Sequence, residues 1–193
     1  MKWEYAKTAD NITAEDCGWV DHIKIGRFPG GYLDTGGNTL ASLTIPAVNM
    51  YWPRTVMARV DFDNLTGIIG GSGNWATSGY RTLFATSGSG GNRFITINNG
   101  VLGLSISGTF RSSGYSVSGL TGWNHIAAVG YSVGSTGYTV FYVNGVRVGS
   151  VVAYQLTSTG LDTIGNSNYS TRLECIGRVD DAAVFNRALS QKR

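Results

Sequence analysis

Two Asn-Gly pairs constrain the fold of this chain more than any other feature. Asn99-Gly100 separates the runs RFITIN and VLGLSIS, and Asn144-Gly145 separates YTVFYV and VRVGSVV. A two-residue type I′ turn needs a positive φ at both central residues, which Asn and Gly tolerate best. Each pair therefore predicts a tight hairpin between two antiparallel strands.

Alternating apolar residues predict further strands around these hairpins. One apolar face is expected between residues 55 and 62, made of Val56, Ala58, Val60 and Phe62. A second is expected between residues 101 and 107, made of Leu102, Leu104 and Ile106. The run from Trp123 to Tyr131 is apolar on both faces, which predicts a strand in the centre of its sheet.

Composition favours an all-β fold and excludes several classes of protein. The chain has 28 Gly among 193 residues, and 14% of its residues are charged, against about 25% in an average globular chain. Its net charge of +3 comes from scattered basic residues, whereas nucleic-acid-binding proteins cluster them, so we expect no nucleic-acid partner. No run is long enough to cross a membrane.

The second half of the chain resembles a known family. From Gly122 it reads GWNHIAAVGYSVGSTGYTVFYVNGVRVG, and after a gap it reads IGRVDDAAVFNRALS. This order resembles the laminin-G-like jelly rolls of the concanavalin A-like lectin/glucanase superfamily, as do the earlier segments Phe28–Thr35, Val56–Val60 and Leu83–Thr86. The resemblance implies an antiparallel two-sheet β-sandwich, a jelly roll, over residues 28–193. Residues 1–27 fit it poorly, and we expect them to form an N-terminal arm or edge strand.

The catalytic motif of glucanases with this fold is missing from the sequence. Glucanases of this fold carry Glu-x-Asp-x-x-Glu on one inner strand, where one carboxylate attacks and another protonates. Here the three glutamates, Glu4, Glu15 and Glu174, lie far apart, and the nearest substitute is Asp61-Phe62-Asp63, which alternatively ends a strand. A serine-nucleophile site is not expected, because the chain has only two histidines, His22 and His125, and His125 is expected to be structural. We therefore expect no enzymatic activity and keep a glycoside hydrolase only as a remote alternative.

The resemblance also implies a structural Ca²⁺. Its candidate ligands are Asp34, from YLDTG, and Asp180 or Asp181, from RVDDA. Hard cations prefer oxygen ligands from carboxylates and carbonyls. The alternative is that Asp180 and Asp181 form charge-assisted hydrogen bonds with arginines or backbone amides.

Aromatic residues in two Gly/Ser-rich segments are the candidate glycan ligands. We interpret residues 70–79 and 108–118 as long loops, and loops on a rigid sandwich commonly carry binding groups. Trp75 and Tyr80 belong to the first region, and Arg111 and Tyr115 to the second. Trp75 alternatively caps the sandwich or packs on a neighbouring subunit, so a homo-oligomer is a further expectation.

Two cysteines, Cys17 and Cys175, lie near opposite ends of the chain. They either pair, where the geometry of neighbouring strands allows it, or stay as free thiols, which we favour.

The N-terminal residues contain no apolar run of signal-peptide length, so we expect a virion component or a fragment of a larger secreted protein. These observations predict a non-catalytic binding or assembly module, exposed on a phage virion and contacting host-surface glycan. The alternatives are a capsid or tail decoration protein that binds other virion proteins, and a carbohydrate-binding module of a secreted bacterial protein.

Overall fold

The computed structural model describes residues 22–24, 33–34, 43–50, 54–62, 80–86, 92–154, 158–165 and 178–189. Its elements are thirteen strands: β1 (His22–Lys24), β2 (Leu33–Asp34), β3 (Leu43–Met50), β4 (Arg54–Asp61), β5 (Tyr80–Thr86), β6 (Arg93–Asn98), β7 (Val101–Ile106), β8 (Thr109–Ser116), β9 (Trp123–Val133), β10 (Thr136–Val143), β11 (Val146–Val152), β12 (Ser158–Ile164) and β13 (Arg178–Phe185). No helix in this part of the chain is long and apolar enough to cross a membrane. Cys17, Cys175 and Trp75 lie outside the described residues.

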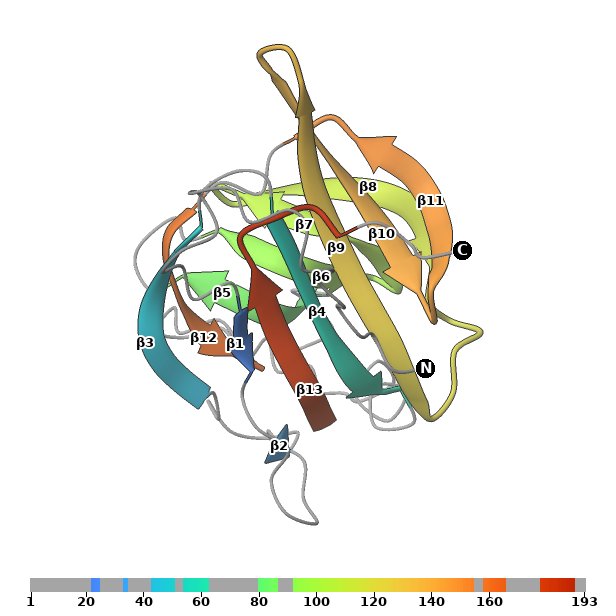
Figure 1. The fold of residues 1–193 in the computed structure, drawn as a ribbon. Coiled ribbons are helices and arrows are strands. Elements are labelled where there is room, and N and C mark those ends of the chain that lie inside the picture. The colour runs from blue at the N-terminus through green and yellow to red at the C-terminus, as the bar shows by residue number, and fades with distance from the viewer. Residues whose placement is uncertain are drawn as a thin grey trace, which may run out of the picture.

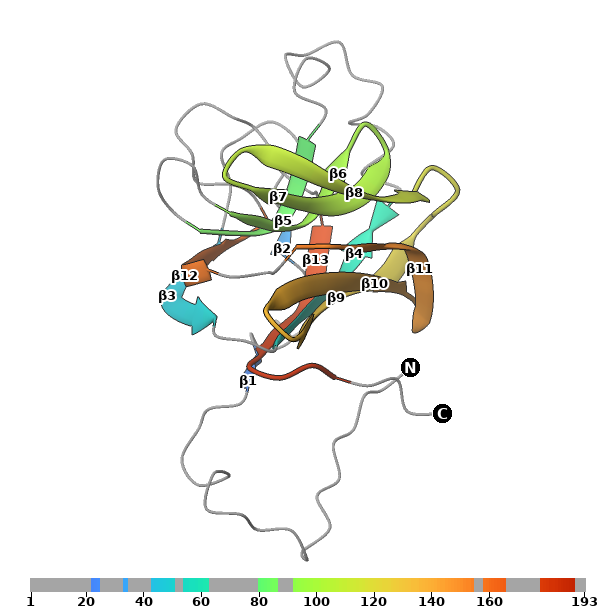
Figure 2. The ribbon, with the colours of Figure 1, turned by 90° about the horizontal axis from the view of Figure 1, so that it is seen from above.

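The strands form two antiparallel sheets that face each other. The seven-stranded sheet has the order β1-β13-β4-β9-β10-β11, with β2 also paired to β13. The six-stranded sheet has the order β3-β12-β5-β6-β7-β8. Figures 1 and 2 show the two layers stacked, with β4, β9 and β10 in one and β5 to β8 in the other. The predicted β-sandwich is therefore confirmed.

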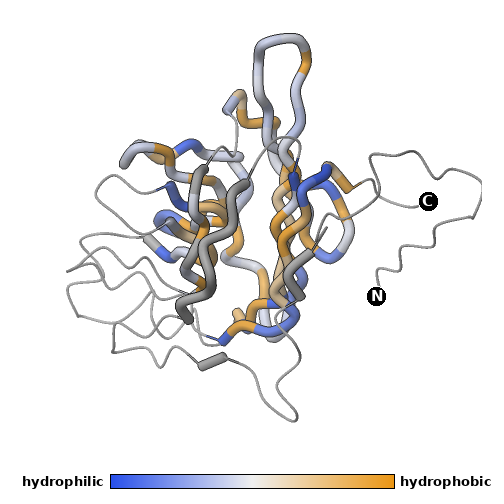
Figure 3. The backbone as a smooth tube through the Cα atoms, turned by 60° about the vertical axis from the view of Figure 1, so that its left-hand side comes forward, coloured by the Kyte–Doolittle hydropathy of each residue, from blue (hydrophilic) through white to orange (hydrophobic). Residues whose placement is uncertain are grey.

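The core lies between the layers and contains the residues that the alternation predicted. Val56, Ala58 and Val60 of β4 are fully buried. Leu102 and Leu104 of β7, in the other sheet, are buried in the same core. β9 pairs with β4 on one side and β10 on the other, so its predicted central position is confirmed. In Figure 3 the apolar colour concentrates along the strands of both layers.

Both Asn-Gly hairpins have the predicted geometry. The φ angles are 47° and 77° at Asn99 and Gly100, and 50° and 80° at Asn144 and Gly145. Asn144 also joins its turn to β9, because its Oδ1 accepts a bond from the His125 amide at 2.9 Å. Its Nδ2 donates to Asn124 Oδ1 at 2.8 Å. The second turn is thereby held against the start of β9.

The predicted loop at residues 108–118 is wrong, because most of this segment is strand β8. Ser107 and Gly108 form a further turn with two positive φ angles, 47° and 79°, although Ser rarely adopts such a φ. A register shift between β7 and β8 absorbs the extra residues, and Ser113 Oγ donates to the Leu102 carbonyl at 2.7 Å within it. The hydroxyl groups that suggested a loop thus satisfy backbone groups of a strand.

One edge of the sandwich is closed by close contact between the sheets. A Cβ on Gly149 of β11 would lie 2.5 Å from the Ser113 carbonyl oxygen of β8, so only glycine fits there. Gly149 also has a φ of +65°. This contact, here called the β8–β11 seam, joins the last strand of each sheet.

Candidate functional site

Three of the four predicted glycan ligands, Tyr80, Arg111 and Tyr115, lie on described strands, β5 and β8. Tyr80 is the first residue of β5, and the register runs from it through Asn98 and Val101 to Ser116. Tyr115 therefore lies at that end of the sheet, where its half-buried ring packs against the core. Arg111 pairs with Leu104 farther along β8. Tyr80 and Tyr115 thus lie toward one end of the sheet, and Arg111 lies four residues from Tyr115 along β8.

Arg111 instead stacks on a residue that the sequence did not single out. Its guanidinium carbon lies 4.6 Å from the centroid of the Tyr154 ring. Tyr154 follows β11 and is 38% exposed, so part of its ring faces solvent. An arginine over an aromatic face gains cation–π attraction while its remaining N–H groups stay available as donors. We call this pair the Arg111–Tyr154 platform.

Backbone bonds fix the tyrosine of the platform. The Tyr154 amide donates to the Val152 carbonyl at 2.8 Å. Thr139 Oγ1 donates to the Tyr154 carbonyl at 2.9 Å. Since the β8–β11 seam holds the two strands together, the ring and the guanidinium are preorganised.

The charge of Arg111 has an unusual sequence environment. The Arg111 Nε is buried and has no hydrogen-bond partner among the described residues. The sequence contains no Asp or Glu between residues 64 and 161, a stretch that includes Arg81, Arg93, Arg111 and Arg147. Strands β5 to β11 therefore carry no carboxylate that could neutralise this cation.

A second arginine–aromatic pair has a different environment. Arg59 lies 5.7 Å above the Trp123 ring on the outer face of the seven-stranded sheet. In register, Trp123 pairs with Asp61 and Arg59 pairs with Asp180. Unlike the Arg111–Tyr154 platform, this pair therefore has aspartates beside it, Asp61 on β4 and Asp180 on β13.

His125 lies on the same outer face and is half-buried. Its Nε2 is 3.4 Å from the sulfur of Met57. Burial lowers the pKa of the imidazole below 6.5, and the nearby Arg59 charge acts in the same direction while Asp181 opposes it. The ring is therefore neutral near pH 7, as a structural residue requires.

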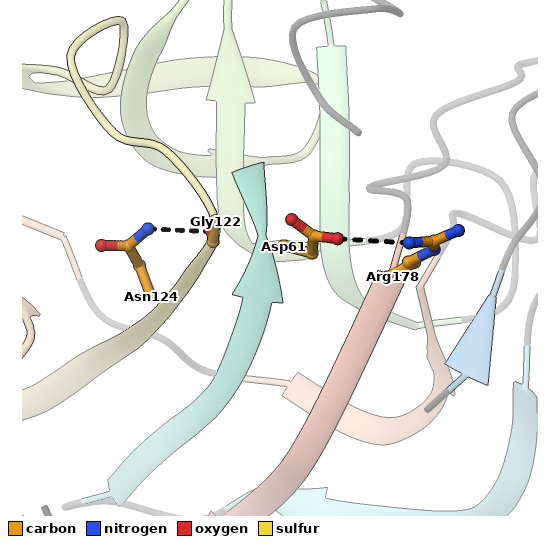
Figure 4. A network of polar contacts seen from close by, with 4 residues as sticks. All are labelled: Asp61, Gly122, Asn124 and Arg178. Carbon is orange, nitrogen blue, oxygen red and sulfur yellow. Dashed lines mark hydrogen bonds and ion pairs between the residues drawn. The ribbon is translucent and has the colours of Figure 1, made fainter. Parts of the chain in front are cut away.

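The predicted calcium ligands lie along β2 and β13. Arg178 pairs in register with Asp34 on one side and Asp61 on the other. Its Nη1 lies 3.6 Å from Asp61 Oδ2, and Figure 4 shows these two side chains pointing toward each other. Asp180 Oδ1 accepts a bond from the Asp181 amide at 2.8 Å, where Asp181 has a positive φ of 50°.

These contacts match part of the alternative to calcium, since Asp180 bonds a backbone amide. The described residues contain no group of three or more His, Cys, Asp and Glu side chains arranged for a metal ion. The side chain of Asp34 lies outside the described part, so calcium stays a prediction from the resemblance.

Comparison with known families decides the classification. A laminin G-type family model, described as the concanavalin A-like lectin/glucanases superfamily, matches residues 27–193. The chain belongs to this superfamily. The predicted resemblance is thus confirmed over most of the sequence, while no curated protein matches the chain.

Three solved structures are similar to the chain at low identity. A mutant Trypanosoma rangeli sialidase with trans-sialidase activity is 18% identical, with a TM-score of 0.45 over 72% of this chain and 22% of that one. A mutant of HCR/D is 14% identical, with a TM-score of 0.48 over 78% of this chain and 39% of that one. Domain 4 of AbnA, a Geobacillus stearothermophilus arabinanase in complex with arabinotriose, is 12% identical, with a TM-score of 0.45 over 83% and 84%. This chain therefore spans less than half of the first two proteins.

Two residues of the platform region escaped the sequence-based interpretation. Tyr154 had a usable signal, because it is an aromatic residue followed by the polar run QLTSTG, like Trp75 in its own segment. Gly149 had none, because a glycine that permits contact between two sheets looks like any other glycine in the sequence.

Proposed function

We propose that this chain is a non-catalytic carbohydrate-binding module whose ligand contacts the Arg111–Tyr154 platform. The observation that carries the proposal is the guanidinium held 4.6 Å over a partly exposed tyrosine ring. Sugar-binding sites combine an apolar ring, on which the C–H face of a sugar packs, with a few fixed polar groups. The platform provides both within a preorganised edge of the sandwich.

The charge around the platform favours a glycan with acidic groups. A guanidinium can donate two parallel hydrogen bonds to a carboxylate or sulfate. Because residues 64–161 contain no carboxylate, the ligand would meet no like charge from strands β5 to β11. Such binding should weaken as ionic strength rises.

The same distribution of charge supports binding without hydrolysis. Glycosidases need a pair of carboxyl groups flanking the scissile bond. The strands that form the platform lack Asp and Glu altogether. Asp61, part of the nearest substitute for a glucanase motif, lies 3.6 Å from Arg178 on another strand of the sheet.

Glycan-array screening followed by calorimetry tests the proposal. Removing charge-assisted hydrogen bonds of about 1.5–3 kcal/mol should weaken acidic-glycan binding at least about tenfold in Arg111→Gln. Tyr154→Ala should weaken it by a smaller factor, since aromatic contacts contribute about 0.5–1.5 kcal/mol. Arg147→Gln, which removes an exposed arginine of β11, is the matched control and should bind normally.

Two results would reject the proposal. One is a wild-type protein that binds nothing on a broad array of acidic and neutral glycans. The other is equal loss in Arg111→Gln and Arg147→Gln, which would indicate diffuse charge attraction without a defined platform.

The particle or larger protein to which the module belongs is a separate proposal. Adhesion of a phage virion to host glycan remains our preferred setting, with capsid or tail decoration and a secreted polysaccharide-binding protein as alternatives. Neighbouring capsid or tail genes would support the first two, and polysaccharide-degradation genes would favour the third.

A further inference from the structure

The hairpin between β9 and β10 extends beyond the rest of the sandwich. Figure 1 shows it projecting well past the ends of the neighbouring strands. Residues Tyr131 to Tyr138 form this extension, here called the β9–β10 ribbon. Val133 pairs with Thr136 across a two-residue turn in which Gly134 has a φ of +59°, as a type II′ turn requires at its first central position.

Both edges of the ribbon lack a partner strand among the described residues. On one side, the pairing of β4 with β9 begins at Arg54 and Gly130. Pro53 precedes Arg54 and has no N–H with which to extend that ladder. On the other side, the register of β10 with β11 starts at Thr139 and Val152.

The surface of the ribbon lacks the usual protection against pairing with another chain. Residues 132–136 are exposed, and Val133 is 65% exposed at the tip. The ribbon contains no charged residue and no proline, the devices that normally keep open strand edges apart. The rings of Tyr131 and Tyr138 stack at 5.5 Å on one face, which makes the ribbon more rigid.

Backbone N–H and C=O groups along a hairpin strand point alternately toward the partner strand and outward. This alternation identifies the residue whose backbone groups face the open edge of β9. In an antiparallel hairpin closed by a two-residue turn, the residues flanking the turn bond each other, and the next pair points its N–H and C=O groups outward. Ser132 pairs with Gly137 at that position. Its backbone donor and acceptor are therefore directed to the open edge of β9.

We propose that a second copy of this chain pairs with this edge about a two-fold axis at Ser132. The two Ser132 residues would exchange both backbone hydrogen bonds. Tyr131 of each copy would lie opposite Val133 of the other, so the exposed valine would gain an apolar neighbour. A two-fold contact uses the same patch on both subunits, and this short uncharged edge is self-complementary.

The contact is small, so the dimer is weak and depends on concentration. Three residues from each copy bury far less than the roughly 1,200 Å² typical of a stable interface. Disulfide trapping detects such an association. Ser132→Cys places two thiols at a hydrogen-bonded antiparallel pair, where Cα atoms lie about 5.5 Å apart, within the range that a disulfide spans.

The experiment compares Ser132→Cys with Val146→Cys under mild oxidation, both with Cys17 and Cys175 replaced by Ser. Val146 is the matched control because it is 63% exposed on a different hairpin. We expect a covalent dimer from Ser132→Cys and monomer from the control. Equal cross-linking of the two variants would overturn the proposal.

Sedimentation of the unmodified chain gives an independent readout. We expect a monomer–dimer equilibrium between about 1 µM and 1 mM. Ser132→Pro removes an outward N–H and no hydrogen bond within the ribbon, so it should abolish the dimer, while the fixed φ of proline should lower the unfolding midpoint only slightly at this exposed edge. Monomer at every concentration, or growth into larger assemblies through the β10 edge, would refute the two-fold pairing.

Discussion

Replacing Gly149 with Ala tests the β8–β11 seam. The substitution forces a residue with a Cβ to adopt φ +65°, which costs about 1–2 kcal/mol. The new Cβ would also lie 2.5 Å from the Ser113 carbonyl oxygen and 3.0 Å from Ser113 Cβ. Overpacking of this kind costs about 1–3 kcal/mol, so the free energy of unfolding should fall by about 2–5 kcal/mol.

Gly114→Ala is the matched control for this prediction. Gly114 has a similar φ of +75°, but nothing lies within 4 Å of its added Cβ. Its replacement should therefore cost only the conformational part, about 1–2 kcal/mol. The difference between the two variants isolates the contact between the sheets.

Urea unfolding measures both variants. A lower midpoint at unchanged m would show that stability changed without a change in the surface exposed on unfolding. If Gly149→Ala were no less stable than Gly114→Ala, β11 would not be held against Ser113 and the reasoning would be refuted. Gly149→Ala should also weaken glycan binding, because it displaces the strand that leads to Tyr154.

The remaining predictions concern the core, the second Asn-Gly turn, one histidine and calcium. Phe141→Ala, at a fully buried position, should lower the free energy of unfolding by about 3–5 kcal/mol, and a loss under 1 kcal/mol in urea unfolding would contradict the packing. Asn144→Ala should cost about 2–4 kcal/mol through two lost side-chain hydrogen bonds and a positive φ, whereas Asn144→Gly should recover part of that loss in the same assay. Because the pKa of His125 is lowered in the folded state, its contribution to stability is complete above about pH 6.5 and decreases as pH falls below that value. Thermal unfolding of His125→Gln should lack this pH-dependent contribution. A pH profile of stability identical to that of the unmodified chain would contradict the prediction. The calcium hypothesis predicts that millimolar Ca²⁺ raises the unfolding midpoint and that Asp180→Asn reduces the rise, while indifference to both calcium and chelator would reject it.

Local sequence patterns predicted strands and turns well where the pattern follows directly from backbone geometry. The alternation at Val56, Ala58 and Val60 reflects the two faces of a strand, and Asn144-Gly145 reflects the φ angles of its turn. The segment at residues 108–118 misled the interpretation because its serines look like loop residues. In the structure Ser113 bonds a carbonyl on β7, a neighbour that local composition does not reveal.

The candidate site was less predictable than the fold. Arg111 was singled out from the sequence, but its predicted companion Tyr115 packs against the core. Its actual neighbour, Tyr154, lies 43 positions later in the chain and comes from the other sheet. Contact between residues so far apart depends on how the last strands of the two sheets meet.

The sequence by itself therefore determined the superfamily, the hairpins, the apolar faces and the absence of a glucanase motif, since these depend on residue type and short spacing. Tertiary structure decided that Arg111 stacks on Tyr154, that Gly149 closes the edge, and that the β9–β10 ribbon extends past its neighbours. Each of these depends on the relative lengths and stacking of strands in two sheets. Residue order along one strand cannot encode where a strand of the opposite sheet ends.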